Sequence, residues 1–186
     1  MTPPPTKSVL ITGCSAGGAG AALAHSFQKR NYLVIATTRN PSKIPKTLTS
    51  LPNVITLALD VTSDTSVNAA AESVKKALAE SNIKGLNVLV NNAGLGWWAP
   101  VLDLPMEDAK AIFETNFFGV IRVTQAFGRE LVDAKGTLVN VSSVSGEPVS
   151  REPFKCVLHS FPLSAHQDII CLRLQEVTTD ISISII

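Results

Sequence analysis

This chain has no basic run and no long apolar segment, and its first residues do not predict a signal peptide. Its 186 residues carry a net charge of +1 without a cluster of Lys or Arg, so it lacks the electrostatic footprint of a nucleic-acid-binding protein. Apolar stretches such as "LNVLV" and "ISISII" are far shorter than the roughly 20 residues of a membrane-spanning helix. The opening "MTPPPTKS" has no apolar region of the kind found in signal peptides.

Cysteine is also scarce. Cys14, Cys156 and Cys171 are odd in number and share no regular spacing, so we expect reduced thiols in a cytoplasmic protein rather than a disulfide framework. Cys156 stands near His159 and His166, but their spacing matches no established ligand pattern. The sequence therefore predicts no metal site.

Apolar residues make up 45% of the chain, which is enough for the core of one ordinary domain. Short apolar runs occupy residues 8–12, 32–37, 54–59, 86–90 and 136–141, and segments of helical spacing occupy 19–30, 64–81 and 106–134. Asp64 and Ser66 are the capping candidates of the second helical segment. Runs with almost no charge are typical of strands buried on both faces, so the alternation predicts a doubly wound α/β sheet.

The segment "TGCSAGGAG" (12–20) joins the first apolar run to the first helical segment. A glycine-rich turn between a strand and a helix exposes backbone N–H groups and lets a pyrophosphate approach closely. An ordinary turn is the alternative. We expect a dinucleotide cradle made of Gly13, Gly17, Gly18 and Gly20, with Thr12 and Ser15 as further cofactor-binding candidates.

The second apolar run ends in "ATTRN". An NAD-binding sheet places an acidic residue here, against the ribose hydroxyls, and this chain has none. Arg39 instead offers a cation for a 2′-phosphate, with Thr38 and Asn40 as neighbours. NADP is therefore the predicted cofactor, and a solvated surface arginine is the alternative.

Five motifs, in order and at roughly the same spacing, resemble those of the short-chain dehydrogenase/reductase family. They are "TGCSAGGAG" (12–20), "LDVTS" (59–63), "NNAG" (91–94), "TNFFG" (115–119) and "NVSSVSG" (140–146). Together with the glycine turn, "TTRNPSKI" resembles the fungal acyl-dihydroxyacetone-phosphate reductase-like branch, a relative of the hydroxysteroid dehydrogenases. The resemblance covers about residues 7–150.

This resemblance implies an NADP-binding Rossmann domain with five parallel strands in the order 3-2-1-4-5. It also implies an NADP(H)-dependent oxidoreductase that acts on a carbonyl group or secondary alcohol of a small lipid-like molecule. The branch further implies association with lipid droplets or the endoplasmic reticulum.

Individual residues receive cofactor roles from the same resemblance. Asp60 would accept a hydrogen bond from the adenine amino group, with Val61 against the ring. Asn91, Ala93 and Gly94 would lie close to the cofactor. A strand-ending turn is the alternative for the "NNAG" segment.

Two catalytic residues are implied as well. Asn116 lies in a helical segment despite its poor helix propensity, and it would bend that helix and hold a water of a proton relay. Ser143 would hydrogen-bond the substrate oxygen beyond the carboxyl end of the fifth strand. Trp97 and Trp98 would border the substrate cleft, or else pack in the core.

The family's proton donor is missing from the expected place. The pattern puts a Tyr about thirteen positions after Ser143 and a Lys four residues later, but position 156 is Cys156 and the only lysine after Ser143 is Lys155. The only tyrosine in the sequence is Tyr32. A cysteine thiol in place of the phenol is conceivable by pKa, but an irregular segment rarely holds it within reach.

Residues 151–186 do not continue the family's pattern. We expect a divergent tail that is poorly ordered or loosely docked, and we attribute it to a change of reading frame or splicing near Ser150. We also expect a flexible N-terminus over residues 1–6. The fifth strand would then be an apolar edge that invites self-association. Three functions stay open: the family activity, NADP(H) binding without turnover, and a non-functional fragment.

Overall fold

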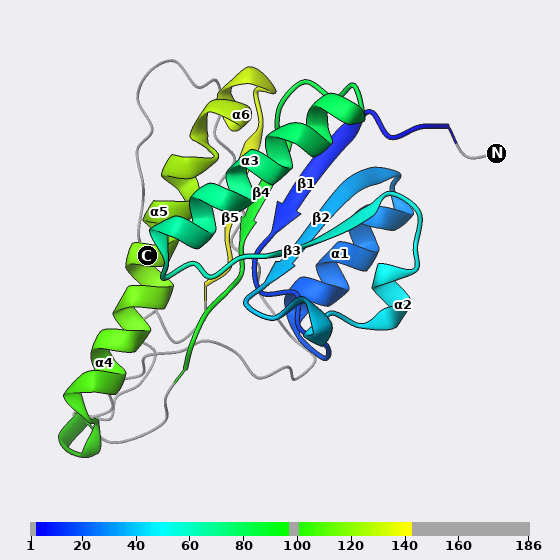
Figure 1. The fold of residues 1–186 in the computed structure, drawn as a ribbon. Helices are drawn as coiled ribbons and strands as arrows, with labels where there is room; N and C mark the ends of the chain where they lie inside the picture. Colours follow the sequence, from blue (N-terminus) through cyan, green and yellow to red (C-terminus); the bar gives the residue numbers. More distant parts are fainter. Residues whose placement is uncertain (1–2, 97–100, 143–186) are drawn as a thin grey trace.

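One parallel sheet organises residues 3–96 and 101–142, which are the part of the chain described by the computed structural model (Figure 1). Its strands are β1 (Lys7–Ile11), β2 (Tyr32–Thr38), β3 (Val54–Ala58), β4 (Val88–Asn91) and β5 (Thr137–Asn140). They pair in parallel in the order β3-β2-β1-β4-β5. The predicted fold class and strand order are therefore confirmed.

Helices cover both faces of this sheet. The α-helices are α1 (Ala19–Lys29), α2 (Lys46–Thr49), α3 (Asp64–Glu80), α4 (Met106–Phe113), α5 (Gly119–Ala126) and α6 (Gly128–Asp133). The described part also contains the 3-10 turns η1 (Pro41–Lys43) and η2 (Val101–Asp103) and the π-helix η3 (Glu114–Phe118). Figure 1 shows α1 and α2 on one face and α3, α5 and α6 on the other. None of these described helices combines the length and hydrophobicity that a bilayer crossing requires.

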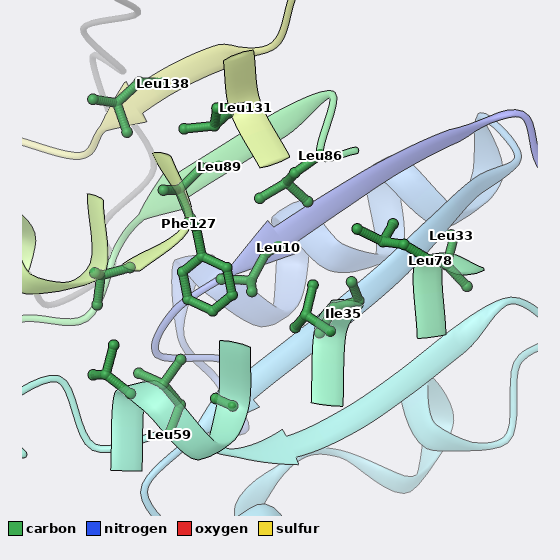
Figure 2. Packing of buried hydrophobic residues seen from close by; sticks show 14 of the residues in the cluster. Leu10, Leu33, Ile35, Leu59, Leu78, Leu86, Leu89, Phe127, Leu131 and Leu138 are labelled. Carbon is green, nitrogen blue, oxygen red and sulfur yellow. The ribbon is translucent and has the colours of Figure 1, made fainter. Parts of the chain in front are cut away.

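The alternation of side chains along the strands explains why the strands carry so little charge. Leu10 and Ile35 face α3 and α5, where Phe127 joins them in one cluster (Figure 2). Their neighbours Val9 and Val34 pack with α1 on the opposite face. All five side chains are fully buried. Because both faces of the sheet are covered, both sets of alternate residues are apolar.

The N-terminus of α3 differs from the expectation. The N-cap is Ser63 rather than Asp64 or Ser66, and its hydroxyl accepts a hydrogen bond from the Ser66 N–H at 3.3 Å. Asp64 already lies in the first turn, where its carboxylate pairs with Arg122 of α5. The Ser66 hydroxyl accepts from the Asp60 N–H at 2.9 Å. Asp64 and Ser66, the two expected caps, therefore contact α5 and the segment after β3 instead.

The long helical segment expected over 106–134 is interrupted. The π-helix η3 separates α4 from α5, and Phe127, with a φ of −104°, separates α5 from α6. Short π-helical turns inside α-helices are frequent at functional sites. Asn116 lies at the centre of η3, where the family resemblance places a bend.

Several expectations concern residues outside the described ranges. These are residues 1–2 of the expected flexible N-terminus, Trp97, Trp98, Ser143 and the tail 151–186. Within the described ranges, the Pro3 carbonyl accepts a hydrogen bond of 3.0 Å from the Asn31 amide. Among the described strands, β5 pairs with β4 alone, which agrees with the expected edge position.

Candidate functional site

A cleft of about 260 Å³ opens at the carboxyl ends of the strands. Its walls come from the segments that follow β1, β2, β3 and β4, and Thr115 of η3 adds to them. Doubly wound sheets bind their ligands beyond these strand ends. Eight predicted cofactor residues line the cleft: Gly13, Ser15, Gly18, Arg39, Asp60, Val61, Ala93 and Gly94.

The glycine turn, residues 12–20, forms one wall. Gly13 and Gly17 have φ values of +76° and +77°, a backbone conformation that favours glycine. Gly18 is the N-cap of α1, and no side chain caps this helix or places an acidic group in its first turn. The first N–H groups of α1 therefore remain available to an anion.

Gly20 and Thr12 act behind this wall rather than on the cleft surface. A Cβ atom on Gly20 would lie 2.6 Å from the Gly13 carbonyl oxygen and 2.6 Å from Asn92 Nδ2. The Thr12 hydroxyl accepts hydrogen bonds from the N–H groups of Asn92 and Ala93, both at 2.9 Å. These contacts fix the glycine turn to the segment after β4.

Asn92 is a site residue that was not predicted from the sequence. Its amide nitrogen donates to the carbonyl oxygens of Thr12 at 2.8 Å and Gly13 at 3.1 Å, and its side chain also borders the cleft. The "NNAG" segment pointed to this place. The sequence alone did not separate the roles of the two adjacent asparagines.

Asn91, by contrast, lies away from the cleft lining. Its side chain is buried and donates to Thr124 Oγ1 at 3.2 Å and to Asn140 Oδ1 at 2.9 Å. It joins β4 to α5 and β5. Asn91 thus supports the sheet edge beneath the site, and its expected contact with the cofactor stays a prediction.

Arg39 lies on the exposed rim of the cleft, directly after β2. Beside it, the hydroxyls of Ser15 and Thr38 are 3.2 Å apart, which ties the glycine turn to the end of β2. The part of the cleft next to Arg39 therefore combines a cation with two hydroxyl groups. Such a combination suits a phosphate ester.

Asp60 lines the cleft after β3. Burial raises the pKa of its carboxyl, but hydrogen bonds from the Thr62 N–H and hydroxyl, with the charges of Arg39 and Arg122, lower the pKa below 3.8 overall. The Thr62 bonds are 3.0 Å and 2.7 Å long and both reach Oδ1. Asp60 is therefore an anionic acceptor at neutral pH, as its expected role toward an amino group requires.

Asn116 lies beside the cleft on its helical side, next to residues that line it, but does not line it itself. Its Oδ1 accepts from the Leu95 N–H and its Nδ2 donates to the Leu95 carbonyl, both at 2.8 Å. Leu95 and Thr115, the residue before Asn116, both line the cleft. The structure thus brings Asn116 to the site, while Ser143, its expected catalytic partner, lies outside the described residues.

Tyr32 lies at the opposite end of the sheet. It begins β2 and packs edge-on against Phe27, with ring centroids 5.1 Å apart, whereas the cleft lies past the last residue of that strand, Thr38. The only phenol of the chain is therefore not part of the cleft.

A family model described as short chain dehydrogenase matches residues 7–153. A short-chain dehydrogenase of Talaromyces islandicus, cctT, is 42% identical over 77% of this chain and 49% of its own length. The NADPH-dependent 1-acyldihydroxyacetone phosphate reductase of Schizosaccharomyces pombe is 44% identical over 80% of this chain and 47% of its own length. The chain spans about half the length of these curated relatives.

Two of the relatives align beyond this region. The mitochondrial D-beta-hydroxybutyrate dehydrogenase of Bos taurus is 35% identical over 100% of this chain and 54% of its own length. That alignment includes the tail, which the sequence analysis sets apart from the family pattern. The proposed change of frame or splicing near Ser150 thus stays a prediction.

Solved structures share the fold at lower identity. The NADPH-bound carbonyl reductase from chicken fatty liver has a TM-score of 0.67 at 28% identity, over 77% of this chain and 62% of that one. The alcohol dehydrogenase of Thermococcus sibiricus, in complex with 5-hydroxy-NADP, has a TM-score of 0.69 at 26% identity, over 77% of this chain and 61% of that one. Sheet order, cleft position and the family model agree, and the chain belongs to the short chain dehydrogenase family.

Proposed function

We propose that this chain binds NADP(H) and belongs to an oxidoreductase that reduces a carbonyl group, or oxidises a secondary alcohol, on a small lipid-like molecule. The observation that carries the proposal is the position of Arg39. It follows β2 directly and borders the same cleft as the glycine turn. A guanidinium at this place favours the 2′-phosphate that distinguishes NADP from NAD.

The residues of the cleft fit the proposed cofactor. The glycine turn leaves space for a pyrophosphate and the uncapped start of α1 can receive it, while Arg39 would hold the 2′-phosphate and Asp60 the adenine amino group. At about 260 Å³, the cleft is smaller than most small-molecule sites, which enclose roughly 300–1,000 Å³. The glycine turn, Arg39 and Asp60 are proposed to hold the phosphates and the adenine, and on that ground we assign the adenosine half of the cofactor to the described residues. When bound, NADPH supplies a hydride to the substrate.

The proposed substrate class rests on the relatives. The yeast relative is by its name a reductase of 1-acyldihydroxyacetone phosphate, which carries an acyl chain and a ketone. The chicken liver structure is by its title a carbonyl reductase. Both names support a carbonyl substrate, and the first supports a lipid-like one. A cytoplasmic location and self-association through β5 are further parts of this proposal.

A second candidate function is NADP(H) binding without turnover. The placement of Tyr32 favours it, because the only phenol of the chain lies at the end of β2 remote from the cleft. A reduced ketone leaves an alkoxide that needs a positioned acid. The two candidates share the cofactor site and differ in whether a proton donor is present.

Titration of the full chain with NADPH, with NADH as the control, tests the shared part of both candidates. Protein fluorescence can report binding. We expect NADPH to bind about ten- to a hundredfold more tightly than NADH, because one charge-assisted phosphate contact contributes roughly 1.5–3 kcal/mol. Equal affinity for the two cofactors, or no binding of either, would contradict the proposal.

A further inference from the structure

The side chain of Arg122, in α5, is hydrogen-bonded to three separate segments of the chain. Its Nε donates to Asp64 Oδ1 at the start of α3, its Nη1 donates to the Val61 carbonyl at 2.7 Å, and its Nη2 donates to Glu114 Oε1 at 2.8 Å. The arginine side chain is only 22% exposed. All three of its nitrogen atoms are therefore bonded, and its planar fork sets the directions of the bonds.

The uncharged partner of Arg122 is the backbone carbonyl of Val61, and Val61 belongs to a wall of the cleft. Asp60, Val61 and Thr62 follow β3 and all line the cleft, and we call residues 60–62 the adenosine turn. Arg122 itself does not line the cleft. It reaches the adenosine turn from behind, through the backbone of the middle residue.

Gly119 brings α5 close enough for this contact. It lies one helical turn before Arg122, and a Cβ atom at this position would be 2.9 Å from Val61 Cγ2 and 3.1 Å from Val61 Cβ. The side chain of Val61 thus packs directly on the helix backbone while its carbonyl is bonded to Arg122. The side chain and the backbone carbonyl of Val61 are thus both held by α5.

The surroundings keep the guanidinium charged and in place. Burial lowers the pKa of Arg122, but its bonds to Glu114 and Asp64 and their negative charges raise it overall. Exposed ion pairs contribute little on their own. This group is mostly covered, however, and its bond to a carbonyl is charge-assisted and stronger than a neutral one.

We infer that Arg122 is a positioning residue for the cofactor: it holds the adenosine turn in the conformation that receives the adenosine half of NADP(H), without contacting the cofactor itself. This inference rests on the proposed function. It adds a residue that none of the five sequence motifs contains. Removal of the arginine side chain frees the Val61 carbonyl and leaves two carboxylates without their cation, so the turn loses its fixed orientation.

The test compares Arg122→Ala and Arg122→Lys with the unmodified full chain. Two ligands are titrated: NADPH, and adenosine 2′,5′-bisphosphate as the adenosine half with its 2′-phosphate. We expect Arg122→Ala to weaken both ligands by about the same factor, roughly tenfold. Arg122→Lys keeps the charge but not the fork, so we expect a loss of about threefold or more for both.

Val34→Ala is the control, because Val34 of β2 is fully buried in the core cluster on the opposite face of the sheet, which contains no residue of the adenosine turn. Its loss of methyl groups destabilises the fold without touching the adenosine turn. We expect a lower melting temperature with unchanged affinity of the folded protein for both ligands. A purely structural role of Arg122 would give that same pattern for Arg122→Ala and would overturn the inference.

Each remaining outcome of the titrations contradicts either the proposed function or the role of Arg122. No binding by the unmodified chain would overturn the proposed function, and this inference with it. Binding that both Arg122 variants leave unchanged would overturn the inference alone. A loss confined to NADPH, with adenosine 2′,5′-bisphosphate unaffected, would place the effect at the nicotinamide half of the cofactor and contradict the assigned role. Should Arg122→Ala not fold, Arg122→Lys decides by the same criteria.

Discussion

Asn116 and Leu95 are joined by two hydrogen bonds of 2.8 Å, because the side-chain amide of Asn116 pairs with both the N–H and the carbonyl of Leu95. Asn116 lies inside a π-helix, and Leu95 belongs to the segment that leaves β4 along the cleft. The bonds connect these two walls directly. An aliphatic side chain of similar size has neither the donor nor the acceptor.

Asn116→Ala should therefore lower the free energy of unfolding by about 1–3 kcal/mol, since two hydrogen bonds are lost and partly buried backbone groups lose their partners. Urea denaturation followed by circular dichroism measures this change. Gln125→Ala, at an exposed position of α5, is the control and should stay within about 0.5 kcal/mol. Equal stability of the two variants would show that the Leu95 contact contributes nothing.

Gly20→Ala and Gly128→Ala should change stability in opposite directions. A Cβ on Gly20 meets two atoms at 2.6 Å, whereas one on Gly128 meets nothing within 4 Å. Overpacking costs about 1–3 kcal/mol, while Gly→Ala at an unstrained site contributes about 0.4–1 kcal/mol. Thermal unfolding measures both. Destabilisation by Gly128→Ala would contradict the open space at that position.

Thr62→Val should weaken folding in a pH-dependent way. The Thr62 hydroxyl donates to Asp60 at 2.7 Å and helps to lower the pKa of that carboxyl below 3.8. A lowered pKa in the folded state stabilises the protein above the pKa of the unfolded state, and this contribution is lost as the pH falls through the folded value. The stability difference between the variant and the unmodified chain should thus be full at pH 7 and shrink below pH 3.8.

The control for this series is Ser73→Ala. Ser73 donates to the Ala69 carbonyl at 2.9 Å on the exposed side of α3, and that bond involves no titrating group. Its effect in urea denaturation should be the same at pH 7 and pH 3. A Thr62→Val effect equally independent of pH would separate Thr62 from the ionisation of Asp60.

Arg39→Ala should remove most of the preference for NADPH over NADH. Arg39 is exposed and belongs to the cleft rim, so its loss removes the proposed phosphate contact without disturbing the core. We expect affinity for NADPH to fall about ten- to a hundredfold while affinity for NADH changes little. Lys46→Ala, another exposed cation, should leave both affinities unaltered. A preference that survives in Arg39→Ala would assign discrimination to other residues.

Much of the fold follows from local sequence patterns. The runs at 8–12 and 32–37 contain no charged residue, so they predict strands that are covered on both faces. The observed strands β1 and β2 lie within one residue of these ranges. The glycine turn was also predictable from its own residues. Several glycines close together are seldom required except where a turn lies directly against a ligand or another backbone segment.

The details that escaped prediction depend on contacts between distant segments. Ser63 and Asp64 are both suitable caps by residue type. In the structure Ser63 is the cap, and Asp64, one residue later, pairs with Arg122 of α5. The choice between Asn91 and Asn92 depends on which face of β4 meets the glycine turn. A pattern within one segment cannot show such long-range partners.

Turnover is the last property that the chain's residues allow us to predict. The loss of a positioned general acid costs about 10²- to 10⁴-fold in rate, or roughly 3–5.5 kcal/mol. Tyr32 lies at the far end of β2. Cys156 stands at the place where the family has its Tyr, and Lys155, the only lysine after Ser143, is out of register with the place of the family's Lys. Asn116 and Ser143 alone do not protonate an alkoxide efficiently. The second candidate function, NADP(H) binding without turnover, therefore predicts that the chain, as its sequence stands, oxidises NADPH with ketones no faster than its Ser143→Ala variant.

Three proteins decide this prediction: the unmodified chain, Ser143→Ala, and a chain whose residues after Ser150 are replaced by the family's Tyr- and Lys-containing segment. NADPH oxidation is followed by absorbance with a panel of ketones, after binding of NADPH has been established for each protein. Only the third should show turnover, because it alone has a phenol that can reach the cleft. Activity of the unmodified chain that disappears in Ser143→Ala would contradict the prediction, and Cys156→Ser would then test the cysteine thiol as the replacement proton donor.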